Sequence, residues 1–169
     1  MSNLRLLNET TATSVSSISI TDVFSSDFDI YKITYTMSDA SVGTAIDLRL
    51  INLSGSIVSS NYDFARLLMY ANTSFVQSTG TNQTFMRGMG EATEQGNGNI
   101  FYLFNCFSSS SYTFGLGQSA GVTGTDNLNF KWIGVLKNTK GMKGFNLFTA
   151  DGTVLDTFEA KTYGLRVDT

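Results

Sequence analysis

The sequence predicts an all-β protein, an antiparallel β-sandwich of the jelly-roll type with long Gly/Ser-rich loops. Apolar and polar residues alternate with a period of two in short runs along most of the 169 residues. Serine, glycine and asparagine separate these runs at roughly 10-residue spacing, which is typical of sandwiches and barrels. The length is that of a single domain, which can bury ~70% of its unfolded surface.

The run Thr44–Asn52 shows the alternation most clearly. Ile46 and Leu48 fall on one side of this run, and Asp47 and Arg49 fall on the other. Because successive side chains of a strand point to opposite faces, we expect the side that carries Asp47 and Arg49 to be in water.

Other runs divide into faces in the same way. Ser14–Ile20 is polar and alternating, which suits an edge strand or a strand that faces a partner. Ile100–Phe104 is apolar on both faces, as is expected of a central strand that is covered on both sides. Two longer runs gather large side chains on one face: Tyr31, Ile33, Tyr35 and Met37 within Phe28–Met37, and Phe130, Trp132 and Leu136 within Phe130–Lys137.

Three further segments are less regular. Asp63–Tyr70 fits a strand or a short helix, and the strand is favoured because a helix of this length is unstable alone. Asp151-Gly152 has the composition of a hairpin turn. Thr162 and Tyr163 interrupt an alternation, which predicts a β-bulge.

The remaining segments are predicted as loops or as a terminal extension. Arg87–Asn99, which is rich in glycine, and Gly117–Asn129 are predicted as long loops. Met1–Thr13 has a weak pattern and is predicted as an N-terminal arm. A single β-sandwich domain then covers residues 14–169, because no repeat or linker composition divides the chain.

The composition excludes several classes of enzyme and metal site. Histidine is absent and Cys106 is the single cysteine. Without histidine there is no Ser–His–Asp or Cys–His pair and no His-containing zinc site, and without a second cysteine there is no disulfide framework. Cys106 follows a strongly apolar run and is predicted to be a buried structural thiol. We expect no enzyme activity, no catalytic residue, no cofactor and no metal.

The charge argues against a nucleic acid or a membrane as partner. The formal charge is −3, and no run of three basic residues offers a phosphate-binding patch. No segment approaches the roughly 18 consecutive apolar residues of a membrane span. The first residues lack the long apolar core of a signal peptide, which favours synthesis in the cytoplasm.

Three other patterns resemble ligand sites. Asp22, Asp27 and Asp29 lack the glycine and the terminal glutamate of a calcium loop, which favours a turn capped by side chains. Gly115–Gly121 resembles a dinucleotide fingerprint, but no helix pattern follows it. The paired carboxylates of a hydrolase stay open as an alternative, because 14 acidic residues offer many pairs.

Aromatic residues make up 12% of the chain, and most of them occupy alternating strand positions, which favours a role in the core. Tyr62, Tyr70 and Tyr112 lie at predicted strand ends or in loops. These three tyrosines are the candidates for stacking on a sugar ring, and a carbohydrate-binding module is therefore an alternative function.

Charged residues make up only 15% of the chain, against about 25% in an average domain. Sheets with few charged residues are exposed to pairing at their edges. The sequence therefore favours a protein whose edges or faces are covered by copies of itself, for example in a trimer, or by another partner.

Five stretches carry a resemblance to a known group of proteins: Ser17–Phe24, Tyr31–Thr34, Asp47–Asn52, Tyr112–Gly115 and Tyr163–Val167. They are strand and turn signatures spread over nearly the whole chain, and the C-terminal stretch is the most suggestive. The chain resembles small virion structural proteins, decoration or tail-associated, of tailed bacteriophages, especially those of marine and cyanobacterial phages.

The resemblance implies a non-enzymatic β-sandwich that is mounted in many copies on the virion, most simply as a capsid decoration or cement protein. The implied partners are further copies of the chain and other virion proteins such as the major capsid protein. A tail fibre, a knob or a host-receptor (carbohydrate) binding module is the alternative. The resemblance transfers no catalytic residue.

Overall fold

A computed structural model describes residues 3–38, 43–71, 75–92, 96–123 and 126–166. In these residues the protein has twelve strands in two sheets, and every pair of neighbouring strands is antiparallel. This confirms the predicted antiparallel β-sandwich. Among the described residues, no helix has the length and apolar character needed to span a bilayer.

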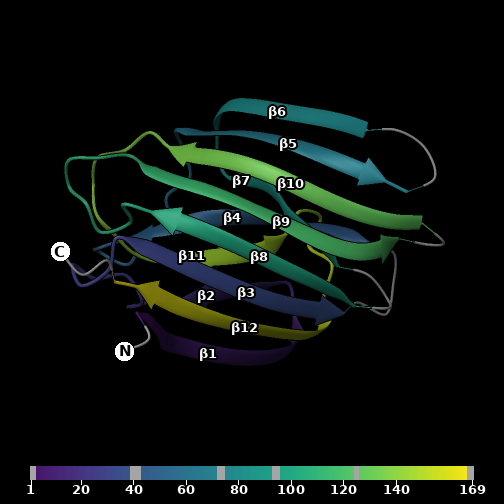
Figure 1. Cartoon of the computed structure of the whole chain (residues 1–169), viewed down its shortest axis with the longest axis horizontal. Coiled ribbons are helices and arrows are strands. Elements are labelled where there is room, and N and C mark those ends of the chain that lie inside the picture. Colours follow the sequence, from purple (N-terminus) through teal and green to yellow (C-terminus); the bar gives the residue numbers. More distant parts are fainter. Residues whose placement is uncertain (1–2, 39–42, 72–74, 93–95, 124–125, 167–169) are drawn as a thin grey trace.

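The two sheets differ in size, and Figure 1 views the larger one face-on with the smaller one behind it. The eight-stranded sheet consists, in spatial order, of β1 (Leu4–Val15), β12 (Leu155–Leu165), β3 (Ile30–Ser38), β8 (Asn97–Phe104), β9 (Thr113–Thr123), β10 (Asp126–Leu136), β5 (Tyr62–Tyr70) and β6 (Phe75–Gln83). The four-stranded sheet consists of β2 (Ser17–Ile20), β11 (Met142–Thr149), β4 (Thr44–Asn52) and β7 (Met86–Ala92).

Most buried apolar side chains form one core between the inner faces of the two sheets, and Leu68, Leu128 and Phe130 form a second, smaller cluster. The predicted alternation is confirmed in β3 and β10; in β4 the inward residues are buried as predicted, but Asp47 is buried as well. Asp63–Tyr70 is a strand, part of β5. The predicted edge strand is confirmed for Ser17–Ile20, which forms β2. The largest fully buried core side chains are Trp132, Tyr31, Tyr35, Tyr62, Phe101, Phe130, Phe145, Phe158, Ile33, Ile46, Leu48 and Leu50.

The inner face of β9 is nearly bare, which makes room for the indole of Trp132 on β10. A Cβ on Gly115 would lie 3.0 Å from the Trp132 ring. A Cβ on Gly117 would lie 2.6 Å from Phe101 Cβ and 2.7 Å from the carbonyl oxygen of Ile100. Glycine is required in this strand because a neighbouring backbone and two rings approach it closely.

The N-terminal segment is part of the sheet and not a separate arm. Residues 4–13 belong to β1, which pairs with β12 from Leu4 opposite Leu165 to Val15 opposite Leu155. The weak hydrophobic pattern of this segment fits its position, because an edge strand has one side open to water. Residues 1 and 2 lie outside the described part of the chain.

The two predicted long loops are mostly strand. Residues 87–92 and 97–99 belong to β7 and β8, and residues 117–123 and 126–129 belong to the long hairpin formed by β9 and β10. Their glycines suggested loops because glycine is depleted in strands on average. Here the contacts of Gly115 and Gly117 across the core outweigh that preference.

Two local expectations need adjustment. Thr162 and Tyr163 lie at an irregularity, but β12 stays in register with β3 and the extra residue is Leu7, on β1.

Asp151-Gly152 is a turn, with Gly152 at φ +82°, but the strands on either side belong to different sheets. The chain therefore crosses from one sheet to the other at this turn and does not form a hairpin.

Gly117→Ala should lower the free energy of unfolding by about 1–3 kcal/mol, because the added methyl group overpacks the core. Gly98→Ala on β8 is the matched control, since a Cβ there meets nothing within 4 Å. Urea titration followed by tryptophan fluorescence measures both changes. Equal effects of the two substitutions would contradict the tight contact at Gly117.

Candidate functional site

The outer face of the eight-stranded sheet carries apolar side chains across most of its width. In the strand register, Phe104 of β8 lies opposite Phe114 of β9, and Phe114 lies opposite Val135 of β10. In the next row, Leu116 of β9 lies opposite Ile133 of β10. We call these outward side chains the apolar band: Leu4, Leu6, Leu165, Tyr163, Ile30, Tyr102, Phe104, Phe114, Leu116, Ile133 and Val135.

The band lies at one end of the sheet, the end where β8 and β10 finish and β9 begins (left in Figure 1). Its centre is open to solvent, with Ile133 61%, Phe114 46% and Leu116 45% exposed. These residues border a shallow hollow of about 500 Å³ that also contains Ala65 of β5 and Thr79 of β6. Solvent-exposed apolar side chains that gather in one place, unlike single ones, indicate an interaction surface.

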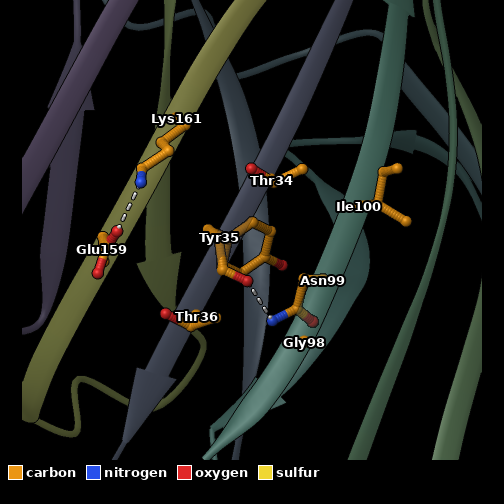
Figure 2. A pocket seen from close by; sticks show the side chains of 8 residues that line it. All are labelled: Thr34, Tyr35, Thr36, Gly98, Asn99, Ile100, Glu159 and Lys161. Atoms are coloured by element: carbon orange, nitrogen blue, oxygen red, sulfur yellow. Dashed lines mark hydrogen bonds and ion pairs between the residues drawn. The ribbon is translucent and has the colours of Figure 1, made fainter.

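The polar part of the same face holds a second depression, which Figure 2 shows from close by. It has a volume of about 410 Å³ and lies over β12, β3 and β8. Thr34 and Thr36 of β3 line it together with Glu159 and Lys161 of β12, and Gly98 of β8 leaves one end without a side chain.

Lys161 joins β1 and β12 at the border of this depression. Its ammonium group lies 3.1 Å from a carboxylate oxygen of Glu9 and 3.2 Å from one of Glu159. Hydrogen bonds to these two carboxylates raise the pKa of Lys161. The two glutamates form a carboxylate pair, but both are about half exposed and share one lysine. A glycosidase general acid needs a desolvated carboxyl group, which this arrangement does not provide.

Asp47 was expected in water, but the structure covers it on the outer side of the small sheet, where its register partners are Phe148 of β11 and Arg87 of β7. Its side chain is fully buried, its Oδ1 accepts a hydrogen bond from the Gly88 N–H at 3.2 Å, and its Oδ2 lies 3.6 Å from Arg87 Nε. The register of β7 shifts beside Asp47, and Gly88 takes φ +86° in the resulting bulge. This bulge brings a backbone N–H to the carboxylate, which sequence alternation does not reveal.

The outer face of the small sheet is partly covered by guanidinium and aromatic groups. The guanidinium carbon of Arg49 lies 4.4 Å from the ring centroid of Phe148 and 5.9 Å from that of Phe85. The two rings meet edge to face at 5.9 Å, and Arg87 lies 5.1 Å from the Phe85 centroid. Cation–π contacts of this kind hold both arginines on the sheet, and Arg87 lies beside Asp47.

Burial raises the pKa of the Asp47 carboxyl group, and the charge of Arg87 and the Gly88 N–H oppose the shift only in part. A raised pKa is a common property of catalytic acids. However, Asp47 does not line either depression on the large sheet. The Asp47 carboxylate lies at the edge of the small sheet, where it accepts the hydrogen bond from the β7 bulge.

The three candidate sugar-stacking tyrosines do not form one site. Tyr62 is fully buried, and its hydroxyl group donates to the Val58 carbonyl and accepts from the Leu50 N–H, so its ring is not available for a sugar. Tyr70 lies at the far end of β5 from Tyr62 and is only partly exposed. Tyr112 is 43% exposed and precedes β9, at the end of the sheet away from Tyr70.

The other residues singled out in the sequence, Cys106 and Asp22, are held by packing or by an ion pair. Cys106 is a free thiol that is 1% exposed, as predicted, and burial raises its pKa well above the usual value. Asp22 pairs with Lys143 at 3.5 Å. Among the described residues, no group of three or more His, Cys, Asp or Glu side chains could hold a metal ion.

The comparisons with known proteins find no family and only weak structural similarities. No family model matches the chain, and no curated protein matches it. Three solved structures are weakly similar over 95–98% of the chain. The first is a CBM22-1 xylan-binding domain from Paenibacillus barcinonensis, with 10% identity, 72% of that chain covered and a TM-score of 0.31. The second is a PL-14 alginate lyase from Aplysia kurodai, with 9% identity, 82% of that chain covered and a TM-score of 0.37. The third is the VP2 protein of infectious bursal disease virus, with 8% identity, 40% of that chain covered and a TM-score of 0.20.

Sequence reasoning did not assign the apolar band, although two signals were present. Ile100–Phe104 was expected to be covered on both sides, but its outward residues Tyr102 and Phe104 are only partly buried in the described chain. Ile133 and Val135 alternate with the core residues Trp132 and Leu136, which puts these two apolar residues on the opposite face of the same run. Both observations pointed to an apolar outer surface, and the sheet order was needed to join them.

Asp47→Asn should change how stability depends on pH. Because the folded-state pKa of Asp47 lies above the unfolded value near 3.8, its contribution to stability is present at low pH and is lost as pH rises through the folded-state pKa. The free energy of unfolding of the parent minus that of the variant should therefore fall as pH rises above the unfolded value near 3.8. Urea titrations at each pH measure this difference. A difference that rises with pH would show that the ion pair with Arg87 dominates.

Proposed function

We propose that the chain is a non-enzymatic structural protein of a bacteriophage virion, mounted in several copies as a capsid decoration or cement protein. The observation that carries the proposal is the apolar band. A protein that works by contact needs an exposed apolar surface on a rigid support, and the band lies on a hydrogen-bonded sheet of eight strands.

The chemistry of the exposed side chains supports contact and not catalysis. The carboxylates beside the polar depression are solvated and form ion pairs with Lys161. The buried acid Asp47 is held by Arg87 and Gly88 at the edge of the other sheet. The resemblance to small virion proteins agrees with such a role, in which a subunit that binds only the assembled shell stabilises it by mass action.

The carbohydrate-binding alternative has less support. Of its three candidate side chains, Tyr62 is buried, and Tyr70 and Tyr112 lie at opposite ends of the large sheet. At about 3.3 Å per residue along a strand, the latter two are too far apart to stack on the same sugar. Tyr112 alone stays exposed enough for such a contact.

Particles purified from the phage that encodes the chain should contain it in many copies. Caesium chloride banding followed by quantitative mass spectrometry measures its ratio to the major capsid protein. Because the proposed contact is apolar, washing the particles with 1 M NaCl should leave the chain bound, whereas contacts between exposed charges weaken at this salt concentration. Recovery of the chain only in the unbound fraction would overturn the proposal, and release by salt would overturn the apolar contact.

A further inference from the structure

We propose that the apolar band packs against the same band of a second copy of this chain, so that two eight-stranded sheets lie face to face about a two-fold axis that runs along β9. The inference rests on the proposed function, because it names the neighbour that this surface meets in a multi-copy assembly. Three features of the surface favour a second copy: its area, the placement of its charges and its shape.

The exposed area fits one side of a stable dimer interface. A large side chain has about 150–250 Å² of surface, so the five most exposed members of the band present roughly 400 Å² of apolar area. These members are Leu4, Leu6, Phe114, Leu116 and Ile133, each 38–61% exposed. A standard interface buries about 800 Å² on each partner, of which somewhat more than half is apolar.

Charged groups lie on both sides of the band. Lys32 of β3 lies two strands from β9 on one side, and Asp63 of β5, which pairs with Lys137 at 3.0 Å, lies two strands from β9 on the other. Rotation by 180° about an axis along β9 exchanges these two sides. Lys32 shares a row with Leu116 and Ala65, so Lys32 of each copy then lies above Ala65 of the other, one row from the Asp63 carboxylate that its ammonium group can approach.

The shape of the face agrees with the same rotation. The hollow lies over β9, β10, β5 and β6, where the outward residue of β5 is the small Ala65. The rotation places β8 of the second copy above β10, and thus brings the large outward side chains Tyr102 and Phe104 toward this hollow. Each copy fills the hollow of the other, as a self-complementary interface requires.

A charge at the centre of the band should break the dimer. Ile133→Asp should raise the dissociation constant of the dimer at least tenfold, since the new carboxylate would be buried without a partner. Thr36→Asp is the matched control, because Thr36 is exposed on the same outer face of the large sheet but lies outside the band and two strands from the proposed axis. Sedimentation equilibrium of both variants measures the change, and circular dichroism shows that each variant is folded.

Cross-linking tests the position of the axis. Each residue of β9 should face its own copy across the interface, about 10 Å away as in packed sheets. Gln118→Cys should therefore cross-link to itself through a bismaleimide of about this length. Gln77→Cys, in the same row but on edge strand β6, should not. The natural Cys106 is buried, so the introduced thiol is the reactive one.

The outcomes separate the two proposals. A monomer at millimolar concentration, or a dimer that Ile133→Asp leaves intact, would overturn the face-to-face dimer. A dimer that Ile133→Asp breaks but that does not cross-link at Gln118→Cys would overturn the axis along β9. A dimer that forms as described in a protein that is absent from virions would support this inference and overturn the proposed function alone.

Discussion

The rest of the structure depends on the difference in size between the two sheets, since eight strands form one sheet and only four form the other. The four-stranded sheet covers the inner face of the large one, where Trp132, Phe101 and Tyr35 lie in a single core. Nothing in the described chain is left to cover the outer face. The fold is therefore complete on one side of the large sheet, while the other side is open to a partner.

The small sheet ends at an irregular strand, and polar groups are buried beside it. Strand β7 is the edge of the small sheet nearest to β9, β10 and β5, and its bulge is bound by Asp47 through the Gly88 N–H. The hydroxyl group of Tyr35 donates to the Met89 carbonyl in the same bulge at 2.6 Å. These bonds satisfy backbone groups that an irregular strand leaves unpaired, which explains why a carboxylate is buried there despite the cost of its desolvation.

Local alternation predicted which residues form the core, because a strand has one inward side whatever its neighbours are. This argument was correct for Tyr31, Ile33 and Trp132. It was wrong for Asp47 and for the glycine-rich part of β9, where the deciding contacts come from strands that are distant in the sequence. The apolar band could not be assigned for the same reason, since its members become neighbours only through the order of the strands in the sheet.

The outer face shows which of its residues the fold itself requires. On β9 and β10, Gln118 and Lys131 lie opposite one another and are exposed, so a polar outward pair is compatible with these strands. One row along, Leu116 and Ile133 have the same backbone environment and no contact with the core, yet both are apolar. The sandwich does not need these two side chains to be apolar. Their apolar character is accounted for by a surface that buries them, and the function of the protein is best sought there.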